Sequence, residues 1–444
     1  KIAIVGSGPS GLSAAARAAQ LGVSHVLLEA ARQPANTIYK YQKGKHVMAE
    51  PGVLPLRSPL SFAAGTRELI LGTWDEELRR RGVNLRFDAN VMHIEGQRGA
   101  FRLVTAGGDV VTAEHVVLAI GLQGNIRTLG VPGEDLPTVQ YQLDDPDAYE
   151  DETIVVVGSG DAGIENALAL TRQNRVLILN RDEEFNRCKE GNQSLLMAAL
   201  KEGRIEARLS TTVTRIEAAE GDFPLRFVAK TATGEETIKC HRVVARLGAS
   251  PPRELVEGFG VVFPNNDAGA VPELSAQYES NVPGLYIVGA LGGYPLIKQA
   301  MNQGYEVVEY ILGNPVEPAD EPLLKKKFAG FARATSVAEG IAIIQKNVPL
   351  LSGLTMLQLR EFMLDSTLHA PKPGEVIFER NDYTNSLYCI VEGEATVIST
   401  HSDGGEARFK RGTGAFFGEM GLISGRRRTA TVVAGPGCIL VETP

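Results

Sequence analysis

The chain opens on Lys1-Ile2-Ala3-Ile4-Val5-Gly6-Ser7-Gly8-Pro9-Ser10-Gly11-Leu12, the stretch that decides the fold. A short apolar run ends in glycines and continues into an alanine-rich helical pattern over residues 13–21. A second apolar run, residues 26–28, then ends at Glu29. The three glycines have the spacing of a dinucleotide-binding turn, in which they permit the tight turn, the approach of a pyrophosphate and close helix–strand packing.

The turn and Glu29 together predict how a dinucleotide is held. The pyrophosphate lies at the helix N-terminus, where unpaired N–H groups point at it. Glu29, at the end of the second strand, accepts a hydrogen bond from a ribose 2′-OH. The alternative is an ordinary glycine-rich turn. Because strand, helix, second strand and acid all occur in order, dinucleotide binding is favoured.

Length and composition set the remaining bounds. The 444 residues predict roughly three domains. A net charge of −8 argues against nucleic acid or an anionic membrane as partner. No signal peptide or membrane-spanning run is apparent, although Lys1 already lies inside a strand and we expect the chain to continue upstream. The four cysteines contain no C-x-x-C pair and predict reduced thiols in a cytoplasmic protein: Cys188, Cys240, Cys389 and Cys438.

The opening pattern repeats at residues 153–164, where a second apolar run passes into a second glycine turn. The following strand, residues 176–179, ends in Asn180-Arg181 rather than in an acid. A carboxylate repels a 2′-phosphate, whereas cationic side chains bind one. The first site is therefore predicted to bind a dinucleotide with a free ribose, and the second is predicted to bind NADPH. The predicted NADPH residues are Gly158, Gly160, Asp161, Gly163, Arg181, Arg187 and Lys189. A solvated charged surface is the alternative for the last three.

Two such units in one chain resemble the pyridine-nucleotide flavin reductases of the low-molecular-weight thioredoxin reductase type. The resemblance implies an α/β fold with two Rossmann-like domains, the FAD domain being split around the NADPH domain. The implied boundaries are 1–146 and 279–314 for the FAD domain and 147–278 for the NADPH domain.

The returning FAD segment is visible as Asn281 to Gly289, followed by a helical stretch from Lys298 to Gly304. By resemblance, Gly289 lies beneath the flavin ribitol, and the helix at Gln299 faces the isoalloxazine. The family usually has Asp where Ala290 stands, so one contact is missing or replaced. The implied FAD residues are Gly6, Gly8, Pro9, Ser10, Gly11, Glu29, Gly121, Gly289, Ala290, Lys298, Gln299 and Ala300.

The thiol relay of the family is absent from the sequence. The segment from Val139 to Pro146 holds no cysteine where the redox pair is expected, and Ser10 stands where related disulfide reductases carry a cysteine. Disulfide reduction requires an attacking thiolate. Cys188, between two cationic residues, could be proposed as a substitute, but an incidental cysteine is favoured. Reduced flavin is therefore expected to pass electrons directly to an external acceptor, with no catalytic side chain.

The composition and the apolar pattern of the sequence change after residue 314. Residues 315–335 are rich in proline and charge and predict a linker. Residues 336–444 begin with helices and continue with short strands separated by glycines, which predicts an α+β domain ending in a small β-roll.

Within this roll, Phe416 to Thr431 resembles the phosphate-binding cassette of cyclic nucleotide-binding domains. The resemblance implies that Arg428 neutralises the cyclic phosphate, that Glu419 binds the ribose 2′-OH, and that Thr429 favours cGMP over cAMP. A ligand-free roll and a roll used only for dimerisation are the alternatives. The implied ligand residues are Phe417, Gly418, Glu419, Met420, Arg428 and Thr429.

Together these features predict an NADPH-dependent FAD reductase regulated by cGMP or cAMP. Its acceptor is a ferredoxin-like carrier or a thioredoxin-type disulfide, and the family implies a homodimer. The second hypothesis is a flavin and cyclic-nucleotide sensor or scaffold that signals to a partner protein.

Overall fold

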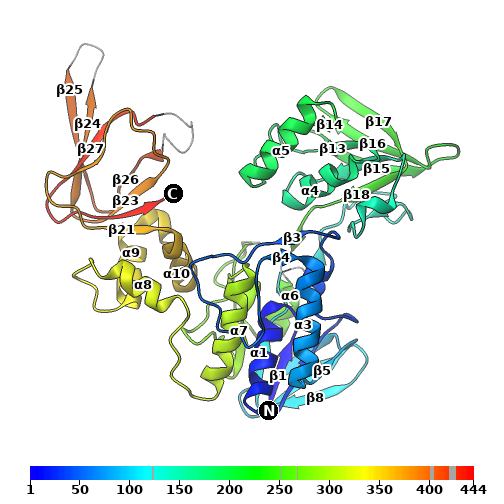
Figure 1. The fold of residues 1–444 in the computed structure, drawn as a ribbon, viewed down its shortest axis with the longest axis horizontal. Coiled ribbons are helices and arrows are strands. Elements are labelled where there is room, and N and C mark those ends of the chain that lie inside the picture. The colour runs from blue at the N-terminus through cyan, green and yellow to red at the C-terminus, as the bar shows by residue number, and fades with distance from the viewer. Residues whose placement is uncertain (123–124, 251, 268, 401–404, 420–426) are drawn as a thin grey trace. The chain divides into compact units, whose positions relative to one another are not determined.

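The computed structural model describes residues 1–122, 125–250, 252–267, 269–400, 405–419 and 427–444. The chain forms two compact units. The first comprises residues 1–52 and 58–312, and the second comprises residues 53–57 and 313–444. Figure 1 shows the elements of each unit along the chain.

The first sheet of the first unit is built around β1 (Ile2–Val5) and has the order β20-β9-β1-β2-β5. All its pairings are parallel, and β1 is fully buried, as an apolar run without alternation predicts. Helices α1 and α7 pack against each other beside this sheet (Figure 1). The bounds are β2 His25–Leu28, β5 Leu85–Arg86, β9 His115–Leu118, β20 Leu285–Ile287, α1 Pro9–Gln20 and α7 Ile297–Ile311.

The segment between β2 and β5 holds three short elements and helix α3, which begins at Arg67. The Thr66 side chain caps this helix by accepting from Leu69 N. The remaining elements of this half are α2 Asn36–Tyr39, β3 His46–Val47, β4 Gly65–Thr66, α3 Arg67–Arg81, and the antiparallel set β6 Val91–Glu95, β7 Phe101–Thr105 and β8 Val110–Ala113.

A second parallel sheet repeats the first, with the order β11-β18-β12-β13-β14. Strand β12 (Thr153–Val157) takes the place of β1, and α4 (Asp161–Leu170) follows it as α1 follows β1. A two-stranded ribbon, β10 with β19, lies where the chain enters and leaves this domain. Further bounds are β10 Asn125–Ile126, β11 Val139–Gln140, β13 Arg175–Leu179, α5 Glu190–Lys201, β14 Ile205–Arg208, β15 Thr212–Ala218, β16 Leu225–Thr231, β17 Gly234–Cys240, β18 Arg242–Ala245, β19 Ala249–Ser250 and α6 Arg253–Gly258.

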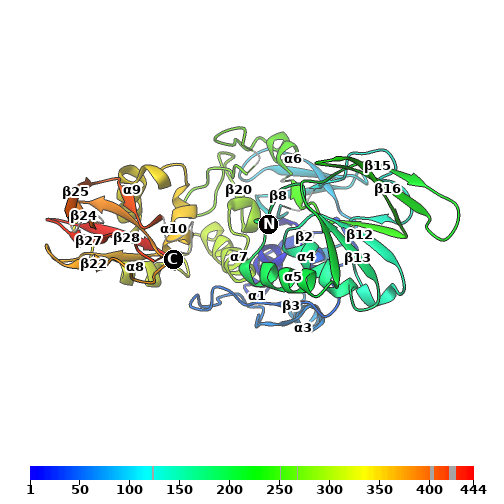
Figure 2. The same ribbon diagram turned by 90° about the horizontal axis from the view of Figure 1, so that it is seen from above.

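The described part of the second unit contains helices α8, α9 and α10 and two four-stranded antiparallel sheets (Figure 2). The stretch predicted as a linker, residues 315–335, contains α8, whose Leu324 and Phe328 are buried in a cluster with α9 and α10. The bounds are α8 Glu321–Phe328, α9 Val337–Asn347, α10 Met356–Asp365, β21 Thr367–His369, β22 Val376–Phe378, β23 Leu387–Glu392, β24 Glu394–Thr400, β25 Glu406–Gly412, β26 Phe416–Phe417, β27 Thr431–Ala434 and β28 Ile439–Thr443.

No described helix combines the length and the apolar character needed to cross a bilayer. Likewise, the described residues contain no cluster of three His, Cys, Asp or Glu side chains suited to a metal ion.

Candidate cofactor and ligand sites

The first glycine turn accepts no larger residue at two positions. Gly6 has φ +97°, and a Cβ there would lie 2.6 Å from Ala119 O. A Cβ on Gly11 would lie 1.9 Å from Gly6 O, so the first turn of α1 packs directly on the end of β1. Gly8 caps α1 and Pro9 follows at its first position. The unpaired N–H groups of this helix end therefore lie at the carboxyl edge of the sheet, where an anion is stabilised.

Glu29 lies beside this turn, as predicted. Its side chain is buried and accepts hydrogen bonds from the Ser7 hydroxyl, from Ser7 N over 2.9 Å and from Ala31 N over 2.8 Å. Three donors hold the carboxylate in one orientation at the end of β2, beside the glycine turn.

The N-terminus of α7 contributes a second part of this site. Gln299 is 4% exposed, and its Oε1 atom accepts no hydrogen bond from any described residue. Gly289 N donates to Gln303 Oε1 over 2.7 Å, and a Cβ on Gly289 would lie 2.7 Å from Ser10 Oγ. The buried ammonium of Lys298 donates to Pro51 O over 2.8 Å. An unsatisfied buried acceptor is costly, so Gln299 indicates a missing donor group.

Three other predicted positions of this site follow or belong to elements of the same domain. Gly121 follows β9 with φ +64°, Ala290 is half-buried in the 3₁₀ turn Gly289–Gly292, and Ala300 is buried in α7.

The second glycine turn reproduces the geometry of the first. Gly158 has φ +107°, and a Cβ there would lie 2.4 Å from Arg246 O. A Cβ on Gly163 would lie 2.0 Å from Gly158 O. The same close packing of helix on strand therefore places the N-terminus of α4 at the edge of the second sheet.

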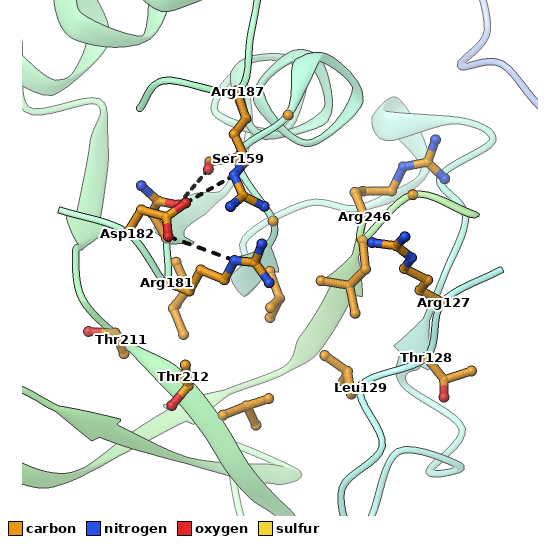
Figure 3. Close-up of a pocket in the computed structure, with 18 residues that line it drawn as sticks. Arg127, Thr128, Leu129, Ser159, Arg181, Asp182, Arg187, Thr211, Thr212 and Arg246 are labelled. Atoms are coloured by element: carbon orange, nitrogen blue, oxygen red, sulfur yellow. Dashed lines mark hydrogen bonds and ion pairs between the residues drawn. The ribbon is translucent and has the colours of Figure 1, made fainter. Parts of the chain in front are cut away.

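This turn opens into a cavity of about 510 Å³ (Figure 3). At the end of β13, Asp182 pairs with Arg187 Nε over 3.0 Å and with Arg181 Nε over 3.8 Å. These two arginines line the cavity together with Gly158 and Gly160, so the structure brings four of the seven predicted NADPH residues together. The cationic pair lies where the first site has only the Glu29 carboxylate.

The other three predicted NADPH residues do not line the cavity. Lys189 caps α5, and its backbone N–H donates to Asp161 Oδ1 over 2.8 Å. Gly163 packs beneath the turn. Residues missed from the sequence do line it: Arg127, Thr128, Leu129, Ser159, Asn180, Asp182, Thr211, Thr212, Val213 and Arg246. Most follow the carboxyl end of a strand, which is the signal that could have identified them.

The β-roll of the second unit surrounds Arg428. This side chain is buried, lies 4.4 Å above the Phe378 ring, and donates to Thr384 Oγ1, Gly418 O and Ser386 O over 2.7, 2.8 and 2.6 Å. Gly418 has φ +98°, and a Cβ there would lie 2.6 Å from Arg428 Nη1. The glycine and the arginine of the predicted ligand site are thus in contact.

The other predicted ligand residues of the roll are placed differently. Phe417 is buried and stacks on Tyr388, Glu419 is half-buried, and Thr429 is exposed. Met420 lies outside the described residues.

A polar network lies beside this cluster. Glu442 accepts from Tyr388 over 2.8 Å and pairs with His369 over 2.6 Å. Burial raises the pKa of Glu442, but hydrogen bonds from Ser386, Tyr388 and His369 outweigh it, so the pKa lies below the ordinary value. Burial, and then Glu442, raise the pKa of Tyr388 to about 12.

The cysteines offer no activated thiol. All four are free, and three are buried. Burial and the Asp161 carboxylate raise the pKa of Cys188, which opposes the lowering expected from its cationic neighbours in sequence.

Fold and site define a two-dinucleotide α/β protein with a C-terminal β-roll. The family model described as pyridine nucleotide-disulphide oxidoreductase matches residues 1–304, and the model described as cyclic nucleotide-binding domain matches residues 369–444. The chain therefore belongs to the pyridine nucleotide-disulphide oxidoreductase family and carries a cyclic nucleotide-binding domain at its C-terminal end. The predicted resemblance and fold class are confirmed.

Several relatives cover the first two-thirds of the chain. A ferredoxin–NADP reductase of Ignicoccus hospitalis is 29% identical over 68% of this chain and 93% of its own. A thioredoxin reductase of Mycolicibacterium smegmatis is 28% identical over 65% of this chain and 88% of its own. The solved bacillithiol disulfide reductase Bdr from Staphylococcus aureus superposes with a TM-score of 0.61 at 22% identity, over 70% of this chain and 98% of its own. The chain is an oxidoreductase related to these reductases.

The residues of the first site fit the FAD that this family implies. Only glycine is accommodated at Gly6 and Gly11, the carboxylate of Glu29 is fixed beside the turn, and Gln299 Oε1 lacks a donor within the described chain. The turn would hold the pyrophosphate and Glu29 the ribose, while Gln299 would face the flavin.

Proposed function

We propose that this protein is a cytoplasmic NADPH-dependent FAD reductase that passes electrons to an acceptor outside the chain and is regulated by cGMP or cAMP. The observation that carries the proposal is the difference between its two nucleotide turns. One turn is paired with Glu29, and the other opens into a cavity lined by Arg181 and Arg187. A free ribose suits the first and a 2′-phosphate suits the second.

When bound, FAD would supply the redox chemistry by taking a hydride from NADPH and releasing electrons to the acceptor. The chain's own residues bind and orient the two cofactors. Gly8 and Pro9 bring the start of α1 to a pyrophosphate, and Arg181 and Arg187 hold the 2′-phosphate. Lys298, at the start of α7, places a buried positive charge beside the flavin site.

The acceptor is proposed to be a ferredoxin-like carrier in preference to a disulfide. Two observations support this choice: ferredoxin–NADP reductases occur among the relatives, and the sequence has no C-x-x-C pair. The raised pKa of Cys188 argues in the same direction, because a protonated thiol is a poor nucleophile. Thioredoxin reductases among the relatives keep a disulfide protein as the second candidate.

Anaerobic mixing with NADPH tests the reductase. We expect the flavin absorbance to bleach within seconds, and more slowly with NADH. A flavin that stays oxidised would instead support the sensor or scaffold hypothesis. Comparing reduction of a ferredoxin with that of a thioredoxin by the NADPH-reduced protein then distinguishes the two acceptors.

The regulatory part of the proposal rests on the second unit. Residues 53–57, inserted between Gly52 and Ser58 of the flavin-binding half, belong to this unit, and Arg57 donates to Glu317 O. The covalent chain therefore links the unit that would bind the cyclic nucleotide to the segment that carries Pro51, the acceptor of the Lys298 ammonium. We expect saturating cyclic nucleotide to change the rate of NADPH oxidation. Equal rates with and without it would contradict the coupling.

Thr429 is proposed to select guanine, by the resemblance of the cassette. We expect Thr429→Ala to weaken cGMP binding and to leave cAMP binding unchanged in calorimetric titrations. The protein is further proposed to be a homodimer, which sedimentation would test.

A further inference from the structure

The nucleotide cavity contains a second pair of arginines that the 2′-phosphate does not explain. Arg127 and Arg246 lie at the opposite end from Arg181 and Arg187 (Figure 3). Among the residues that line the cavity, Asp182 is the sole acid, and it pairs with the first two arginines. The second pair therefore makes its end of the cavity cationic without a lining carboxylate.

Strand order identifies which part of a dinucleotide reaches this end. Strand β12 lies between β13 and β18, so its glycine turn divides the cavity. Arg181 follows β13 on one side, and Arg246 follows β18 on the other. In such sheets the dinucleotide crosses the first strand, with its diphosphate at the helix N-terminus. Since the 2′-phosphate belongs to the adenosine half, the nicotinamide half lies towards Arg246.

Both arginines are anchored at this end. Arg246 Nη1 donates to Tyr141 O over 2.8 Å, while its buried Nε donates to no acceptor among the described residues. Arg127 N donates to Gly248 O over 3.0 Å, beside the ribbon of β10 and β19. In Figure 3 the Arg127 side chain reaches from this ribbon towards Arg246.

The charge of Arg246 calls for an anion. Burial lowers its pKa, with partial compensation from Glu165 and Asp144, yet arginine stays charged at neutral pH. Arg246 is half-buried and forms no ion pair within the described ranges, and its Nε atom is buried there without a hydrogen-bond partner, so an anion would stabilise this side chain. The sole anionic group of the nicotinamide half is its phosphate in the diphosphate.

We propose that Arg127 and Arg246 bind the nicotinamide-side phosphate of the dinucleotide and thereby position its nicotinamide half. This role rests on the proposed function. It assigns two tasks to the two arginine pairs: Arg181 and Arg187 select NADPH over NADH, whereas Arg127 and Arg246 hold either cofactor.

Calorimetric titration of the full flavin-loaded chain with NADP⁺, NAD⁺ and 2′,5′-ADP tests these tasks, because 2′,5′-ADP lacks the nicotinamide-side phosphate. We expect Arg246→Gln and Arg127→Gln to weaken the binding of NADP⁺ and of NAD⁺ by a similar factor, about tenfold. The affinity for 2′,5′-ADP should be unchanged. Arg181→Gln should weaken the binding of NADP⁺ and of 2′,5′-ADP but not the binding of NAD⁺. Arg226→Gln, an equal loss of charge at an exposed position on β16, should change none of the three.

The inference is overturned if Arg127→Gln and Arg246→Gln bind both dinucleotides with wild-type affinity. It is also overturned if their affinity for 2′,5′-ADP falls by the same factor as their affinity for the dinucleotides. Arg127 is exposed, so its variant decides the matter even if Arg246→Gln unfolds. A wild-type chain that binds neither dinucleotide contradicts the proposed function itself, which is a different result.

Discussion

Ser159 Oγ donates to Asn180 Oδ1 over 2.8 Å, at the position in the second domain where Ser7 Oγ donates to the Glu29 carboxylate in the first. The two domains thus share a serine in the glycine turn and a buried acceptor at the end of the second strand. The acceptor is charged in one domain and neutral in the other. Together with Arg181 and Arg187, this difference carries the proposal of a free ribose in the first site and a 2′-phosphate in the second.

Introducing a negative charge at Asn180, like that of Glu29 in the first domain, should therefore change the preference between NADPH and NADH. We expect Asn180→Asp to lower kcat/KM for NADPH by about tenfold or more, because a buried carboxylate beside Arg181 repels the 2′-phosphate. The value for NADH should change little. Steady-state kinetics with both cofactors measure the ratio, and Asn266→Asp, at an exposed position, is the matched control. An unaltered ratio would remove Asn180 from the specificity argument.

Removing the charge at Glu29 should weaken the flavin site. Glu29→Gln keeps the size of the side chain, but its amide is a weaker acceptor for Ser7 and Ala31 and for the ribose. Since hydrogen bonds to charged groups contribute about 1.5–3 kcal/mol, we expect FAD affinity to fall by about 10- to 100-fold. The flavin content after dialysis and a titration with FAD report it. Glu76→Gln, exposed on α3, should retain the wild-type flavin content.

Cys188 should be dispensable. Its raised pKa keeps it protonated at neutral pH, so we expect Cys188→Ser to oxidise NADPH with its acceptor at the wild-type rate. Alkylation of Cys188 in the wild type should be slow at neutral pH and should accelerate as the pH rises towards its pKa. A variant that holds its flavin yet loses turnover would show that a thiol step exists.

The Glu442 network should make the second unit sensitive to acid. The pKa of Glu442 is lowered in the folded state, so its stabilisation is complete above the unfolded-state pKa and is lost as the pH falls through the folded one. We expect Glu442→Gln to destabilise this unit by about 1–3 kcal/mol at neutral pH. The difference in the free energy of unfolding between this variant and the wild type should become smaller at acid pH. Denaturant unfolding of the full chain over a pH series measures it.

The control for this network is Glu379→Gln, an equal change of charge at an exposed position of the same unit. It should leave the unfolding curve unchanged at every pH. A constant difference between Glu442→Gln and the wild type across the series would show that packing, rather than charge, stabilises the network.

Much of the architecture follows from the sequence alone. Both glycine turns, the order of strand, helix and strand around them, and the acid in one repeat against bases in the other are local patterns. They are readable because the period of apolar residues and the steric demands of a tight turn act over a few residues. The same holds for Gly418 and Arg428 in the roll, which a short motif singles out, whereas their contact is seen only in the structure.

Only the tertiary structure decided which distant residues share a site. It brings Arg127 and Arg246, more than one hundred residues apart in the chain, to one cavity wall, and it leaves Lys189 outside the lining. It also buries α8, in the stretch that composition alone marks as a linker. These outcomes depend on how parallel strands order themselves in a sheet and on which surfaces helices cover. Such long-range packing has no signature in the spacing of neighbouring residues.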